Sequence, residues 1–197
     1  MKRVLLAVFL FAGLSYSDSA VLLQTDFNQL PQGWVSDEDW AFGSFGAALC
    51  VSLQETTWSG EFSTEGDPLV RFPVPHGTDS VIVAVDHWVL LSASPVKSGA
   101  SSSAAIQLWT TQSGWGDYIF SHSVSDSLYA EEMISTYVLT GIPQDTFLGF
   151  RFRGDLTSDS QSNYAEIIWQ VNGMTVTAYG DVLPLSRSTW ASIKASF

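Results

Sequence analysis

The sequence is poor in cysteine and has no acceptor site for N-glycosylation. Cys50 is the only cysteine among 197 residues, so no disulfide can form within the chain. It stands in the apolar segment AALCVSL, which predicts a small buried residue; a free thiol used for dimerisation is the alternative. No Asn-x-Ser/Thr sequence occurs. Small secreted animal domains more often carry disulfides or such acceptor sites, so the two absences favour a bacterial source.

Positive charge is also scarce, and so are apolar runs of membrane-spanning length. The chain has 8 Lys and Arg against 20 Asp and Glu, which gives a net charge of −12. An acidic surface disfavours nucleic acid and anionic membranes as partners, and it is compatible with cation binding. Because no later apolar run is long enough to cross a bilayer, no membrane span is predicted.

The first 17 residues have the pattern of a secretory signal peptide. Lys2 and Arg3 precede the apolar run Val4–Leu14, and small residues stand at Ser15 and Ser17. Cleavage after Ser17 removes two positive charges and no negative one, so the mature chain has a net charge of −14. No cysteine lies near this junction, so a lipid anchor is not expected. The protein is therefore predicted to be secreted and extracellular.

Helical periodicity is absent from residues 18–183, which are predicted to form one domain. About eleven short runs there alternate apolar and polar residues between turn residues, the pattern of strands whose side chains point to opposite faces. Parallel strands need helical crossovers, and none is visible. An all-β, antiparallel two-sheet β-sandwich with jelly-roll connections is predicted. The longest run, Ser80–Ser92, is apolar at almost every position, which predicts a central strand covered on both faces.

The segment Phe147–Gly180 contains three of these runs. Asn172 and Gly173 separate the last two, and this dipeptide is the strongest short-range signal of a β-hairpin, because both residues tolerate positive φ. We expect the last strands to lie beside Val21–Phe27 and to close the sandwich. Trp34 and Trp169 are assigned to the hydrophobic core.

Residues 184–197 are predicted to form a short helical tail. Pro184 ends the last strand, a serine and a threonine follow as candidate caps, and the apolar face of the helix holds Trp190, Ile193 and Phe197. One interpretation is a frayed chain end that docks its tryptophan on the sandwich. The other is a recognition tail, used for self-assembly or for contact with a partner.

Two parts of the chain resemble a known group of domains. Asp26–Trp34, DFNQLPQGW, resembles the F-x-x-x-P-x-G-W opening of secreted bacterial jelly-roll domains, and the segments GFRF (Gly149–Phe152) and WQV (Trp169–Val171) resemble their last strands. These are the MAM-like, choice-of-anchor and carbohydrate-binding-module relatives, with a concanavalin-like β-sandwich. The resemblance implies this architecture rather than an activity. The relatives often carry an aspartate soon after the late tryptophan, whereas this chain has Asn172.

No arrangement of catalytic residues stands out. Glycosidases of this architecture resemble one another through a Glu-x-Asp-x-x-Glu strand, whose paired carboxylates carry out double displacement, and this chain has no such strand. Asp37–Asp39 is predicted to lie in a loop, Glu131–Glu132 stand before a strand, and Glu166 stands alone on its face. The three histidines lack metal-ligand spacing, and no serine has the G-x-S-x-G context. The sequence therefore predicts a protein that is not an enzyme.

A binding face is predicted instead, on the less apolar side of two strands. Alternation leaves Asp86 and Trp88 opposite the apolar face of one strand, and Gln107 and Trp109 opposite that of the next. A tryptophan plane flanked by amide, carboxylate and guanidinium groups suits a sugar ring, whose C–H groups stack and whose hydroxyls form hydrogen bonds. The predicted ligand-binding residues are Asp86, Trp88, Gln107, Trp109, Arg151, Arg153, Glu166 and Gln170, with Trp115 and Tyr118 as a rim.

The alternative for this set is structural: the tryptophans fill a second covered face, and Arg151 or Arg153 pairs with Glu166. A structural calcium ion is a further expectation, held by Asp26 and Asp181 with loop carbonyls, although two carboxylates are few for a hard cation. No other cofactor is expected.

The leading hypothesis is a secreted, non-catalytic β-sandwich module that binds a glycan or another cell-surface ligand. The competing hypothesis is a structural subunit of a surface layer or extracellular filament. A glycosidase-like enzyme is the least favoured of the three hypotheses.

Overall fold

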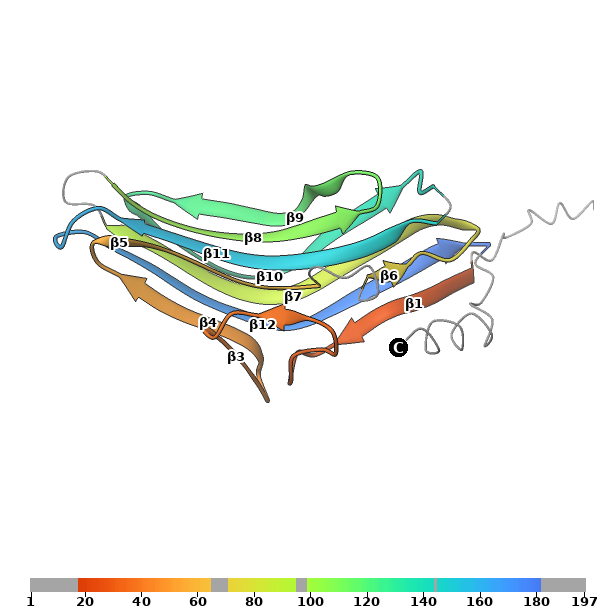
Figure 1. Ribbon diagram of the computed structural model, residues 1–197, viewed down its shortest axis with the longest axis horizontal. Helices are drawn as coiled ribbons and strands as arrows, with labels where there is room; N and C mark the ends of the chain where they lie inside the picture. Colours follow the sequence, from red (N-terminus) through yellow and green to blue (C-terminus); the bar gives the residue numbers. More distant parts are fainter. Residues whose placement is uncertain (1–17, 65–70, 95–98, 144, 182–197) are drawn as a thin grey trace, which may run out of the picture.

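The computed structural model describes residues 18–64, 71–94, 99–143 and 145–181 (Figure 1). These residues form twelve β-strands and no helix, so the all-β prediction is confirmed. None of them belongs to a helix that could cross a membrane. The predicted signal peptide, Met1–Ser17, lies outside the described residues, and so does the tail with Trp190, Ile193 and Phe197.

Sheet A contains six strands. β10 (Ser127–Thr140), β7 (Thr78–Ser94), β12 (Tyr164–Gly180), β4 (Gly46–Leu53) and β3 (Trp40–Gly43) follow one another in space, and β1 (Asp18–Thr25) also pairs with β12. All these pairings are antiparallel. β12 pairs with β7 along one edge and with both β4 and β1 along the other. The prediction that the last strand lies beside the first is therefore confirmed.

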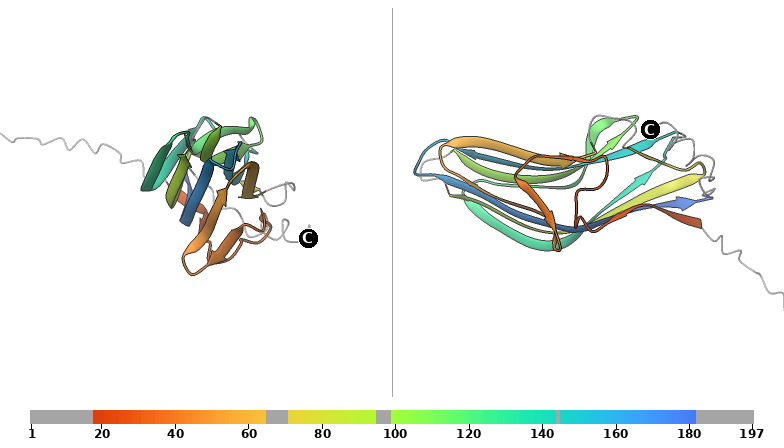
Figure 2. Two further views of the ribbon diagram at one scale, coloured as in Figure 1. Left: turned by 90° about the vertical axis from the view of Figure 1, so that its left-hand side faces the viewer. Right: turned by 60° about the horizontal axis from the view of Figure 1, so that its bottom comes forward.

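Sheet B also contains six strands. β2 (Val35–Ser36), β5 (Thr56–Ser63), β11 (Phe147–Ser158), β8 (Ala100–Thr110) and β9 (Gly114–Val124) follow one another, and β6 (Phe72–Pro73) pairs with the start of β11. The two sheets form an open antiparallel sandwich, and their long strands run bowed along the long axis of the molecule (Figures 1 and 2). The jelly-roll order of the connections stays a prediction.

β7 shows why the chain folds as a sandwich of this kind. Its valines at 81, 83, 85 and 89 are 0% exposed, because this face packs toward sheet B. The alternate residues Ile82, Trp88 and Leu90 are only half-buried. β7 is thus a central strand, between β10 and β12, but the predicted cover on its second face is wrong: an antiparallel sheet can face solvent on one side.

A cluster of aromatic rings fills the space between the sheets. Phe62 from β5 and Phe152 from β11 stack at a centroid distance of 4.4 Å, and Phe27 packs edge-on against both. Trp34 is 5% exposed and Trp169 is 0% exposed, so their assignment to the core is confirmed. Aromatic pairs in such offset or edge-on arrangements each contribute about 0.5–1.5 kcal/mol beyond the burial of their area.

The predicted hairpin at Asn172–Gly173 is wrong, because β12 runs without a turn from Tyr164 to Gly180. Its pairing with β7 shifts between Val171 and Gly173, where Asn172 is the extra residue of a β-bulge. Val171 and Met174 are both buried although they are three positions apart along the chain, an odd spacing. In a regular strand, one extra residue would reverse the inward and outward positions of all residues that follow it. The bulge absorbs Asn172, so the residues on both sides of it keep their buried and outer faces.

Cys50 is exposed, which contradicts its predicted burial. Its neighbours Ala47 and Leu49 on β4 are fully buried and face sheet B, so alternation turns Cys50 to the outer face of sheet A. β2 and β3 had no counterpart among the predicted strands. They have only two and four residues, too few to show a period.

Candidate functional site

A groove lies on the outer face of sheet A. It lies where the edge of β12 opposite β7 changes its partner strand from β4 to β1. β4 pairs with β12 as far as Val171, and β1 pairs with it from Met174 onward. Asn172 and Gly173 stand between these two ladders. A Cβ atom at Gly173 would lie 3.1 Å from the carbonyl oxygen of Thr25, so glycine allows the end of β1 to approach β12 this closely. The bulge and the change of partner together open the groove.

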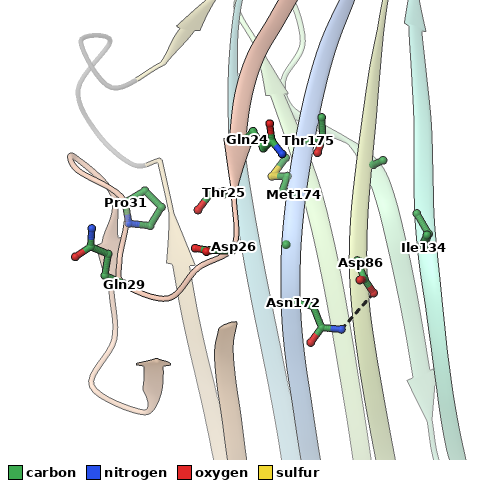
Figure 3. A pocket seen from close by; sticks show the side chains of 12 residues that line it. Gln24, Thr25, Asp26, Gln29, Pro31, Asp86, Ile134, Asn172, Met174 and Thr175 are labelled. Carbon is green, nitrogen blue, oxygen red and sulfur yellow. Dashed lines mark hydrogen bonds between the residues drawn. The ribbon is translucent and has the colours of Figure 1, made fainter. Parts of the chain in front are cut away.

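The turn after β1 places Asp26 at the wall of this groove (Figure 3). Phe27 has φ of 52°, a left-handed conformation that few non-glycine residues adopt. Its amide donates to Thr25 Oγ1 at 3.1 Å, and its ring is fully buried in the aromatic cluster. Asp26 accepts hydrogen bonds from the amide of Asn28, at 3.1 Å, and from the Asn28 side chain. The buried ring of Phe27 holds the turn in place, and the turn holds the carboxylate of Asp26 at the groove.

The groove has a volume of about 570 Å³, which is within the range of small-molecule sites. Its surface is mixed. Apolar parts come from Pro31, Ala84, Ile134, Gly173 and Met174, and polar parts come from Gln24, Thr25, Asp26, Gln29, Asp86, Asn172 and Thr175. Figure 3 shows that these side chains come from β1, the loop that follows it, β7, β10 and β12.

A chain of amide hydrogen bonds runs along one side of the groove. Gln170 Nε2 donates to Asn172 Oδ1 at 2.9 Å, and Asn172 Nδ2 donates to Asp86 Oδ1 at 3.2 Å. Gln170 Nε2 also donates to the carbonyl oxygen of Phe45, whose ring is 82% exposed at the tip of the β3–β4 hairpin. Within the described residues, the side-chain amides of Gln24 and Gln29 have no hydrogen-bond partner. The amides of Gln24 and Gln29 thus face the groove without a partner in the described part of the chain.

The structure divides the eight predicted ligand-binding residues into two groups. β7 and β8 belong to different sheets, so Trp88 and Trp109 lie on opposite outer faces of the sandwich. A single platform that uses both tryptophans is not formed. Asp86, Trp88, Glu166 and Gln170 lie on the outer face of sheet A, and Gln107, Trp109, Arg151 and Arg153 lie on the outer face of sheet B.

Within the sheet A group, Asp86 lines the groove, and Gln170 and Trp88 are register partners in the adjoining row. Glu166 lies farther along β12, opposite Ser92. The structural alternative that pairs Arg151 or Arg153 with Glu166 is wrong, because the arginines are on sheet B. Arg153 instead binds Asp155 at 2.9–3.0 Å, which raises the pKa of Arg153.

The two carboxylates predicted to share a calcium ion are not brought together. Asp26 follows Thr25, which pairs with Met174, whereas Asp181 follows Gly180, which pairs with Asp18 at the other end of β1. The whole length of β1 thus separates them. No group of three or more His, Cys, Asp and Glu residues with the arrangement of a metal site occurs in the described part of the chain.

A buried histidine–serine contact was not predicted from the sequence. His87 is 0% exposed, and its Nε2 lies 2.8 Å from Ser135 Oγ. The indole N–H of Trp169 can only donate, and it points to His87 Nδ1 at 3.3 Å. The ring proton must therefore be on Nε2, where it is donated to Ser135. An imidazole in this tautomer cannot accept the proton of Ser135, so the pair does not form a nucleophile and its base.

His87 should make the protein less stable at acidic pH. Burial lowers its pKa from 6.5 to about 4, against the smaller raising effect of Asp86 and Glu131. As the pH falls, the unfolded chain therefore binds a proton first. The loss of stability begins near the unfolded pKa and levels off below the folded one, at about 3 kcal/mol in all.

Urea unfolding of the wild type and of His87→Gln, at about pH 7 and about pH 4, measures this contribution. Glutamine keeps an amide donor for Ser135 and has no charge to gain. We expect the variant to lose about 3 kcal/mol less than the wild type over this interval. Equal losses in the two proteins would contradict a neutral, buried His87.

Three contributors to these surfaces lie outside the predicted set. Gln24 and Gln29 flank a turn, and their role depends on the partner change of β12, which no local pattern shows. Phe45 stands between two glycines that mark a hairpin tip, and an aromatic residue at such a tip is a usable signal of exposure.

Comparisons with known proteins give loose structural overlaps. No protein-family model and no curated protein sequence matches this chain. Among solved structures, a xylan-binding domain from Paenibacillus barcinonensis is 12% identical with a TM-score of 0.34, over 83% of this chain and 97% of that domain. A carbohydrate-binding module specific for non-crystalline cellulose is 13% identical with a TM-score of 0.27, over 77% and 86%.

The enzymatically active domain of a tailspike protein from bacteriophage CBA120 also overlaps, at 12% identity and a TM-score of 0.27, over 74% of this chain and 20% of that one. Carbohydrate-binding modules are thus among the structural neighbours. At these TM-scores the overlaps transfer no function, so the residues of this chain must decide it.

Proposed function

We propose that this chain is an exported, non-catalytic module that binds a glycan in the groove beside Asn172 and Gly173. One observation carries the proposal: the groove combines apolar surface with the carboxylates of Asp26 and Asp86 and with the side-chain amides of Gln24 and Gln29, for which no partner occurs among the described residues. Sugars need this combination, because their C–H faces pack on apolar groups while their hydroxyls both donate and accept hydrogen bonds. The signal-peptide pattern would deliver the chain to extracellular glycans.

Each part of the groove has a defined role in this proposal. Asp86 accepts hydrogen bonds from sugar hydroxyls, and Asn172 holds it in place through the 3.2 Å contact. Gln24 and Gln29 supply donors and acceptors from the opposite wall. Trp88, half-buried in the adjoining row, extends the apolar surface along which a chain of sugar rings continues.

The charge of the groove favours neutral over acidic sugars. Two of the residues that line it, Asp26 and Asp86, are acidic, and none of the lining residues is Lys or Arg. Like charges in a shared site repel, so a uronate or a sulfate ester would bind poorly there. The proposed ligands are neutral oligosaccharides.

A glycan array followed by calorimetry with the best neutral ligand tests the groove. We expect Asp86→Ala to weaken binding by at least about tenfold, because sugar hydroxyls lose an ionised acceptor. Trp88→Ala should weaken it less, because Trp88 lies beside the groove and not in it. Trp109→Ala is the matched control, since it removes a tryptophan from the opposite sheet.

The control should bind as tightly as the wild type. Equal losses for Trp88→Ala and Trp109→Ala would overturn the location of the site. Failure of every neutral glycan on the array to bind would overturn the proposed function itself.

A further inference from the structure

The positive charges of the described chain gather on one face. Arg71, Arg151 and Arg153 are the only basic residues among the described ones, and all three lie on the outer face of sheet B. The chain as a whole carries a net charge of −12. Such a segregation is unexpected in an acidic protein. Two carboxylates, Glu61 and Asp155, lie beside Arg151 and Arg153 on this face, whereas Arg71 has no ion pair among the described residues.

Two of these arginines lie over neighbouring tryptophan rings. Trp109 on β8 and Trp115 on β9 are register partners, so their side chains stand side by side. The guanidinium carbon of Arg71 lies 3.3 Å from the Trp109 ring centroid, and that of Arg151 lies 4.5 Å from the Trp115 ring centroid. We call this group the Arg–Trp face.

Gly149, the register partner of Trp109 on β11, lies beside this pair. A Cβ atom there would lie 2.7 Å from Thr64 Oγ1, 3.4 Å from Trp109 Cβ and 3.8 Å from Arg71 Cγ. Thr64 Oγ1 accepts a hydrogen bond from the amide of Phe150 at 2.8 Å. Glycine therefore lets Thr64 pack against β11 at this point, next to Arg71 and Trp109.

Stacking occupies the flat face of a guanidinium group and leaves its N–H edge available, because all five N–H groups lie in the plane. The N–H edge of Arg153 donates hydrogen bonds to Asp155 at 2.9–3.0 Å. Arg151 donates to Gln107 Oε1 through both Nε, at 2.8 Å, and Nη2, at 2.5 Å, and its Nη1 is 3.9 Å from Glu61. Arg71 has no hydrogen bond or ion pair with any other described residue. Within the described residues, the edge of Arg71 therefore has no partner, and Arg151 has only the long 3.9 Å contact at Nη1.

We propose that the Arg–Trp face is a second binding site, for the carboxylate or sulfate groups of an acidic saccharide. A planar guanidinium edge matches such an anion with two parallel hydrogen bonds. Arg71 provides the main contact and Arg151 the second, and Tyr118, which is 52% exposed and pairs with Gln107, offers a ring for the sugar to pack on.

Nucleic acid fits this face less well than an acidic saccharide. A duplex carries about one charge per 1.7 Å, and binding depends on neutralising many phosphates. Three arginines, one of them already paired with Asp155, cannot do this on a strongly acidic protein. An oligogalacturonate carries one carboxylate per sugar ring, a lower charge density that Arg71 and Arg151 can match.

Calorimetry on the full chain tests the proposal with an oligogalacturonate, its methyl ester and a sulfated oligosaccharide of similar length. The methyl ester keeps the sugar backbone and removes the charge. We expect the acid to bind at least about tenfold more tightly than its ester, and more weakly as salt is raised. The comparison of carboxylate with sulfate identifies which anion the site prefers.

Arg71→Gln should weaken binding of the acid by about tenfold, and Arg151→Gln should weaken it by less. Arg153→Gln is the matched control, because it removes the same charge from the same face but from an arginine whose edge Asp155 already occupies. Equal losses for Arg71→Gln and Arg153→Gln would overturn the site, as would equal binding of acid and ester, or tighter binding of an oligonucleotide.

This inference is independent of the groove on sheet A. Asp86→Ala should leave binding of the acidic saccharide unchanged, and Arg71→Gln should leave binding of neutral glycans unchanged. A failure of either site is therefore separable from a failure of the other.

Discussion

Replacing Trp169 by alanine is expected to lower the free energy of unfolding by about 3–5 kcal/mol. The ring is 0% exposed at the centre of the sandwich, with Trp40 at a centroid distance of 5.5 Å and Phe152 at 6.1 Å. Alanine would leave a cavity between the sheets, because the strands around it cannot collapse to fill so large a volume. It would also remove the N–H that donates to His87 Nδ1, and this buried acceptor would lose its partner.

Urea unfolding of three variants separates these contributions. Trp169→Phe keeps an aromatic ring in the core and removes the N–H group with part of the ring volume, so it should cost less than alanine, about 1–3 kcal/mol. Trp88→Ala removes the same side chain from the half-buried outer face of the same sheet, and it should cost less than half as much as Trp169→Ala. If Trp88→Ala were as destabilising as Trp169→Ala, the assignment of inner and outer faces would be wrong.

The all-β fold could be predicted because apolar and polar residues alternate locally along its strands. A strand with one face against a second sheet must alternate, and Val81, Val83, Val85 and Val89 of Ser80–Ser92 fall on one face. The same alternation separates Trp169 from solvent and leaves Trp88 and Trp109 on the outer side of their strands. These features depend only on neighbours in the chain, so a single sequence contains them.

The division of the predicted site between two sheets could not be seen in the same way. Alternation tells which residues of a strand share a face, but not in which sheet the strand lies. β7 and β8 are consecutive, yet one pairs with β12 and the other with β11. The contact of Arg71 with Trp109 likewise joins residues from segments with no common pattern. Both depend on long-range pairing, which the sequence does not display.

The step at Asn172–Gly173 shows a different limit. The dipeptide suits a tight turn and a bulge equally well, because both need a residue that tolerates an unusual backbone conformation. Only the pairing partners decide between them. Because β7 continues past this point, the strand runs on and Asn172 becomes a bulge. The groove that follows from the bulge was hidden in the sequence for the same reason.

Replacing Gly46 by alanine is the second change with a large expected effect. Gly46 has φ of 91°, which disfavours any side chain, and a Cβ atom there would lie 2.1 Å from the carbonyl oxygen of Val171. This oxygen belongs to the backbone of β12 and cannot move without breaking the ladder to its neighbours. We therefore expect a loss of at least about 3 kcal/mol, since backbone strain and a clash with a fixed strand add together.

The loss should be accompanied by a change at the groove. Gly46 opens β4 and holds the tip of the β3–β4 hairpin against β12, where Gln170 donates to the carbonyl oxygen of Phe45 at 2.9 Å. A hairpin displaced by the new methyl group would lose this bond and free Gln170 from its position beside Asn172. Affinity for a neutral glycan should therefore fall in the fraction of the protein that still folds.

Gly43→Ala is the matched control at the other side of the same hairpin tip. A Cβ atom there meets no atom within 4 Å, and its φ is not in the left-handed region. Its expected effect is within about 1 kcal/mol of zero, because alanine also restricts the unfolded chain. Urea unfolding compares the two variants directly. Similar stabilities would mean that the hairpin tip does not contact β12 at Val171, and the wall of the groove nearest Gln170 would have to be placed elsewhere.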